Sequence, residues 1–65
     1  MDIYYRIMNP EGEVILNISK TIAIIRDEKI ITFHFENETE NVCSFDTIEL
    51  AKEAMNKIFK ILNEI

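Results

Sequence analysis

The chain of 65 residues contains one cysteine, one glycine, one proline and no tryptophan. A single cysteine excludes an intramolecular disulfide, and a single glycine excludes the Gly-rich loop that holds a phosphate. No apolar run approaches the roughly 20 residues of a membrane-spanning helix. No apolar stretch follows Met1-Asp2, as an export signal would require. We therefore expect a cytoplasmic protein that does not interact with a membrane.

Basic residues are also scarce. Seven Lys and Arg stand against twelve Asp and Glu, for a net charge of -5. Binding to nucleic acid draws most of its affinity from a basic face that meets the phosphates, and here the basic residues are few and scattered. We expect no nucleic-acid partner.

The length leaves room for a single domain, near the lower limit for a self-sufficient core. Natural domains of this size gain stability from disulfides, a structural metal or a partner subunit. Because a disulfide within the chain is excluded, we expect a homo-oligomer, most simply a dimer.

Alternating apolar and polar residues predict a series of short strands. The clearest alternation places Ile31, Phe33 and Phe35 on one face and His34 on the other, which is typical of a central strand. Turn signals at 9–12, 27–28 and 37–41 leave only tight connections, and these favour antiparallel neighbours. The predicted strands are at about 2–8, 13–18, 21–26, 29–36 and 41–45.

The last third of the chain predicts one amphipathic helix over about 47–64. Asp46 is expected as its N-cap, with Glu49 completing a capping box and Phe45 packing against Leu50. The fold class is therefore predicted as α+β, an antiparallel β-meander of four to five strands packed against one C-terminal helix.

The apolar arc of this helix spans roughly 180°, whereas covering one sheet needs a stripe of somewhat more than 100°. Part of the arc should remain available to a second copy or a protein partner. The residues expected at this interface are Ile48, Met55, Phe59, Leu62 and Ile65.

Catalytic chemistry has few candidates. Cys43 and His34 are the only thiol and imidazole, and Asp46 is the carboxylate considered as a third member. No Gly-rich oxyanion loop accompanies them, so we expect a buried cysteine, a surface histidine and no enzyme activity.

Metal and cofactor sites are not expected either. One His and one Cys fall short of the three or four ligands of a zinc site. Glu36, Glu38 and Glu40 have a spacing similar to a calcium loop, but the central glycine and the bidentate glutamate at the twelfth position are missing. This segment is better interpreted as a solvated turn.

Tyr4, Arg6 and His34 form a candidate ligand face, because their side chains stack on or hydrogen-bond to small molecules. On this alternative, an oligomer would bind or sequester a small ligand between its subunits.

The run Phe45-Asp46-Thr47-Ile48-Glu49-Leu50-Ala51, with Met55 and Ile58, resembles the end of small bacterial and phage proteins that pair a short β-meander with one C-terminal helix. The resemblance is one of pattern, covers most of the chain and implies no catalytic residues. The leading hypothesis is a non-enzymatic, self-associating binding module that acts as a regulator or inhibitor by occupying a protein partner.

Overall fold

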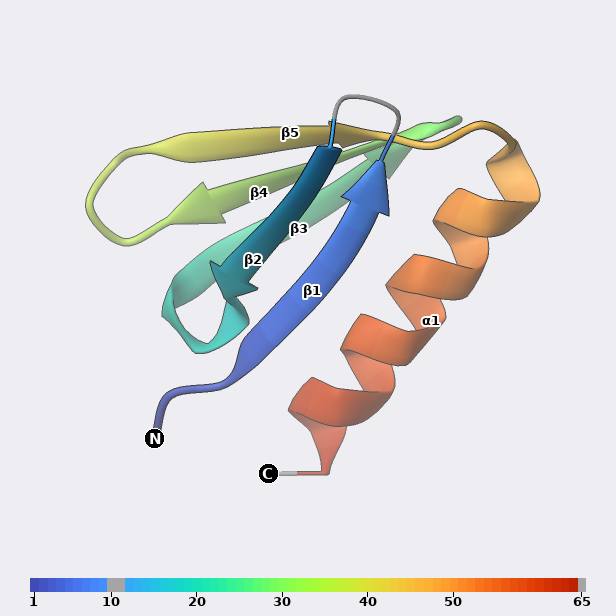
Figure 1. Ribbon diagram of the computed structural model, residues 1–65. Helices are drawn as coiled ribbons and strands as arrows, with labels where there is room; N and C mark the ends of the chain where they lie inside the picture. The colour runs from blue at the N-terminus through green and yellow to red at the C-terminus, as the bar shows by residue number, and fades with distance from the viewer. Residues whose placement is uncertain (10–11, 65) are drawn as a thin grey trace.

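The computed structural model describes residues 1–9 and 12–64, and within them the chain is a five-stranded β-meander followed by one helix (Figure 1). The predicted α+β class is confirmed, and the observed bounds differ from the predicted ones by at most two residues. The elements are β1 (Tyr4–Asn9), β2 (Gly12–Asn17), the 3-10 helix η1 (Ile18–Lys20), β3 (Thr21–Asp27), β4 (Ile30–Phe35), β5 (Glu40–Ser44) and α1 (Ile48–Asn63).

The strands form two antiparallel sheets, β1-β2 and β3-β4-β5. The division occurs at η1, between β2 and β3. Asn17 caps this turn: its Oδ1 accepts hydrogen bonds from the Ser19 amide at 3.2 Å and the Ser19 hydroxyl at 2.6 Å. The amide of Ile18 donates to the carbonyl of Ile3 at 2.8 Å. The chain therefore turns away from β2 before β3 begins, and β2 and β3 are not paired.

The β1-β2 hairpin pairs Asn9 with Gly12. The turn predicted across 9–12 falls partly on residues 10 and 11, which lie outside the described residues. Gly12 has φ +142°, a backbone conformation that residues with a Cβ rarely adopt. Glycine at this position therefore lets the second strand begin without strain.

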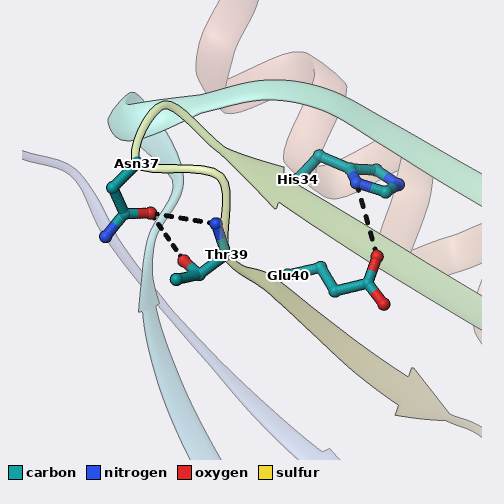
Figure 2. A network of polar contacts seen from close by, with 4 residues as sticks. All are labelled: His34, Asn37, Thr39 and Glu40. Atoms are coloured by element: carbon teal, nitrogen blue, oxygen red, sulfur yellow. Dashed lines mark hydrogen bonds and ion pairs between the residues drawn. The ribbon is translucent and has the colours of Figure 1, made fainter.

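Tight turns join the strands of the larger sheet. Asp27 pairs with Ile30, so only two residues connect β3 to β4. Between β4 and β5, the Asn37 side chain accepts hydrogen bonds from the Thr39 amide at 3.3 Å and the Thr39 hydroxyl at 2.6 Å (Figure 2). Side-chain bonds of this kind replace the backbone pairing that a turn interrupts.

The N-cap of α1 is Thr47, and the prediction of Asp46 was wrong by one residue. The Thr47 hydroxyl accepts a hydrogen bond from the Leu50 amide at 3.1 Å. Glu49 therefore stands in the first turn one position too early to complete a capping box. It still lies where a negative charge favours the helix dipole.

The core lies between the larger sheet on one side and the hairpin and α1 on the other (Figure 1). The strands contribute side chains from alternate positions, as the period of two predicts. The helix contributes one narrow stripe. The buried residues are Ile7, Leu16, Ile18, Ile31, Phe33, Cys43, Ala51, Ala54 and Ile58.

Candidate functional site

An open apolar groove of about 310 Å³ runs between β3 and α1. We call it the β3–α1 groove. One wall is made by residues 21–24 of β3, and the other by Met55, Ile58, Phe59 and Leu62 of α1. None of these eight side chains is charged.

Two large side chains of the β3–α1 groove are left in solvent. Ile22 is 71% exposed and Phe59 is 70% exposed, whereas Ile58 on the adjacent helix position is 2% exposed. Scattered exposed apolar residues are common, but two large exposed apolar side chains that line one uncharged groove are typical of an interaction surface.

The same groove borders a free strand edge. β3 is the first strand of the larger sheet and pairs only with β4. Within the described residues, no backbone hydrogen bond joins Ile22–Asp27 to an element other than β4. A β-bulge between Thr21 and Ala23 shifts the register at the start of this edge. The outward amides and carbonyls of β3 therefore offer a template for another strand.

The residues predicted at a helix interface divide into two groups. Phe59 and Ile48 are exposed, whereas Met55 and Leu62 are partly buried against the core. Ile65 lies outside the described residues. The apolar surface of α1 that stays exposed is thus narrower than the sequence suggested. It is concentrated at Phe59. Nearer the start of the helix, Leu50 is 46% exposed and Ile48 is 36% exposed.

The candidate ligand residues Tyr4, Arg6 and His34 do not share a sheet face. Tyr4 and Arg6 lie on β1, on the side of the hairpin away from the core, and His34 lies on β4 in the other sheet. Because the two sheets pack their inner faces together, these outer faces are separated by the core.

Each of the two outer faces carries a polar contact between side chains of neighbouring strands, and the one on the hairpin is an ion pair. The Arg6 Nε lies 3.5 Å from the Glu13 carboxylate, and the His34 Nδ1 lies 3.5 Å from the Glu40 carboxylate (Figure 2). Both pairs are partly exposed to solvent, so each is expected to contribute little stability.

Cys43 and His34 lie on adjacent strands but on opposite faces of the sheet. Cys43 is opposite Ile31 on the core face and is 1% exposed, whereas His34 is opposite Glu40 on the outer face. The thiol and the imidazole are therefore not brought together. In the part of the chain that the structure describes, no group of three His, Cys, Asp or Glu side chains is arranged to hold a metal ion.

The environment of the Tyr5 phenol shifts its pKa. Burial raises the pKa of the Tyr5 phenol above its ordinary value of 10.0, because the charged form would lose hydration. Tyr5 lies on β1 on the inner side of the hairpin, at the border of the core.

Sequence analysis missed Ile22 and Ala23 as candidate interface residues. The signal was present in the five uncharged residues Thr21–Ile25, which stand between Lys20 and Arg26. Such a run does not show whether a strand is central or at an edge, and that order is set by the tertiary structure.

Comparison with known proteins finds no matching family model, no matching curated protein and no matching solved structure. What the fold itself defines is a small α+β domain with two antiparallel sheets and a C-terminal helix. Among its described residues, no helix combines the length and apolar character needed to cross a membrane.

Proposed function

We propose that this chain is a non-enzymatic binding module that associates with a second copy of itself. The observation that carries the proposal is the β3–α1 groove, where Ile22 and Phe59 remain about 70% exposed beside side chains without charge. When two such surfaces pack together, apolar area is removed from water and no charged group loses its hydration.

The small size of the core supports this proposal. Among the described residues, nine form the buried cluster. The chain has one cysteine, so no disulfide within the chain adds to its stability. An association that binds only the folded form stabilises that form by mass action. A second copy would then supply stability that the isolated domain lacks.

The proposal includes a protein partner that the dimer binds and occupies. The chain would act in the cytoplasm as a small regulator or inhibitor, and it would come from a bacterium or a phage. The support is a second exposed surface, separate from the groove. Tyr4, Met8 and Ile15 are each at least 60% exposed on the outer face of the hairpin, around the Arg6–Glu13 ion pair. This mixed surface would serve the target, and the β3–α1 groove would serve the second copy.

Light scattering at concentrations from the low micromolar to the millimolar range tests the self-association. We expect the mass to rise toward twice the 7.7 kDa of the chain. A mass that stays at 7.7 kDa over the whole range would contradict the proposal. Mass spectrometry of the purified protein under native conditions adds a check, because a retained metabolite would favour a ligand-sequestering oligomer instead.

A further inference from the structure

We infer that two copies join through antiparallel pairing of β3 with β3, so that the two larger sheets become one continuous six-stranded sheet. This inference rests on the proposed self-association and specifies its surface. The free edge of β3 and the β3–α1 groove lie side by side, so one contact would use both. Strand addition at an edge combines main-chain hydrogen bonds with side-chain packing.

A run of five residues without charge distinguishes β3 from the other edge strands. Two chains with a net charge of -5 approach most easily through neutral segments. β3 begins with five uncharged residues, whereas Arg6, Glu13 and Glu40 occupy β1, β2 and β5. Natural edge strands are commonly protected by charges, and the first five residues of β3 have none.

The charged C-terminal end of β3 in one copy complements the start of β3 in the other copy. In an antiparallel pair with its two-fold axis near Ile24, Asp27 of one copy lies close to Lys20 and Thr21 of the other. The contact is two-fold symmetric, so the favourable approach of Asp27 to Lys20 occurs twice. The same register places Arg26 of one copy near Ile22 of the other, which stands at the β-bulge.

The helices also meet in this arrangement. A two-fold axis perpendicular to the joined sheet keeps both copies of α1 on the same side. Phe59, which points into the β3–α1 groove beside the edge, would then pack across the axis on the partner helix. This contact explains why a phenylalanine stands in an exposed helix position.

The outline of the contact is small, in the range of weakly associating pairs. β3 has seven residues and is about 23 Å long at roughly 3.3 Å per residue. The molecule is 19 Å thick along its shortest axis. The flat outline is roughly 440 Å², and side-chain relief brings it toward the about 600 Å² per partner of the smaller specific interfaces. We therefore expect a dimer that dissociates in the micromolar range.

Two variants of one exposed residue test the register. Ile22→Lys would place a second positive charge near Arg26, and we expect the dimer dissociation constant to rise at least about a hundredfold. Ile22→Glu would place a negative charge there, and we expect it to retain most of the dimer. Val42→Lys, at a 57% exposed position on β5 at the opposite edge of the same sheet, is the matched control and should leave the dimer unchanged.

Sedimentation at several concentrations measures the dissociation constants of the wild type and the three variants, and far-UV circular dichroism confirms that each variant is folded. If wild type dimerises and Ile22→Lys dimerises equally well, the pairing through β3 is wrong while the proposed self-association stands. Equal weakening by Lys and Glu would also overturn the pairing. A wild-type chain that remains monomeric would contradict both.

Amide hydrogen exchange of the wild-type chain adds a direct measurement. The outward amides of β3 should become more protected as the concentration rises through the dissociation constant. A monomer whose β3 amides gain protection only when a cell extract is added would assign the edge to a foreign strand, and would overturn the inference.

Discussion

Ile22 of β3 and Phe59 of α1 line the same groove from opposite sides, and they are 71% and 70% exposed. Phe33, with the same side chain as Phe59, is fully buried in the centre of the larger sheet. The two phenylalanines differ only in where the fold places them. One therefore stabilises the domain, and the other is available for association.

Replacing Phe59 should separate association from folding. For Phe59→Ser we expect at least about a tenfold weaker dimer, because exposed aromatic residues at interfaces often dominate the binding energy. The free energy of unfolding of the monomer should change by less than about 0.5 kcal/mol, as is usual at exposed positions. Light scattering and urea denaturation measure the two effects.

The comparison for that variant is Phe33→Ala, which should lose about 3 to 5 kcal/mol of stability through the cavity it leaves. A Phe59→Ser chain that loses comparable stability would show that the ring belongs to the core.

A charge in the buried stripe of α1 should unfold the chain. Ile58 is 2% exposed, and Ile58→Asp would bury a carboxylate without a partner at a cost of about 3 to 5 kcal/mol or more. A domain of this length has roughly 3 to 10 kcal/mol of stability in total. Asn56→Asp, on the exposed side of the same helix, is the control and should melt normally. Cooperative melting of Ile58→Asp by circular dichroism would refute the placement of the helix.

The helix cap offers a direct test of one residue against its neighbour. Thr47→Ala should lose about 1 kcal/mol, since its hydroxyl accepts the bond from the Leu50 amide. Asp46→Ala should lose less, because Asp46 precedes the cap. Urea titration of both variants gives the difference, and a larger loss for Asp46→Ala would return the N-cap to Asp46.

Alkaline pH should destabilise the fold through Tyr5. Its pKa is raised by burial above 10.0, so the folded chain holds the phenolic proton more tightly than the unfolded chain does. This contribution is fully present below pH 10.0 and is lost as the pH rises through the folded-state pKa. Tyr5→Phe should flatten the dependence of thermal stability on pH above about 10. Tyr4→Phe is the control: it retains Tyr5 and should leave this pH dependence unchanged.

Local patterns account for the elements and for much of the core. The alternation in β4 predicted that Ile31 and Phe33 would be inside, and both are fully buried. The wide apolar arc of the helix predicted that some of its apolar side chains would stay uncovered by the strands. Phe59 is the clearest of these, at 70% exposure. The cap was misplaced because Asp46 and Thr47 are both good caps, and the glutamate three residues after Asp46 favoured the wrong one.

Relations between distant segments were not predictable in the same way. Within their own strands, Tyr4, Arg6 and His34 lie on the faces away from the core. The turn capped by Asn17 sends β3 into a second sheet, however, and this separates the two outer faces. Cys43 and His34 occupy neighbouring strands but opposite faces, because the β4–β5 register pairs Cys43 with Ile31. The shared face expected of Tyr4, Arg6 and His34 was wrong because a single sheet was assumed, whereas the expected burial of Cys43 agrees with the structure.

The sequence by itself determined the class of fold, the strands, the helix and the side of each element that faces the core, because these depend on residues close together in the chain. The tertiary structure alone decided that the strands divide into two sheets, that β3 has a free edge and that Phe59 stands beside it. The order of the strands, and which outer faces lie together, depend on how a few turns direct the chain. The local alternation of apolar and polar residues does not encode that direction.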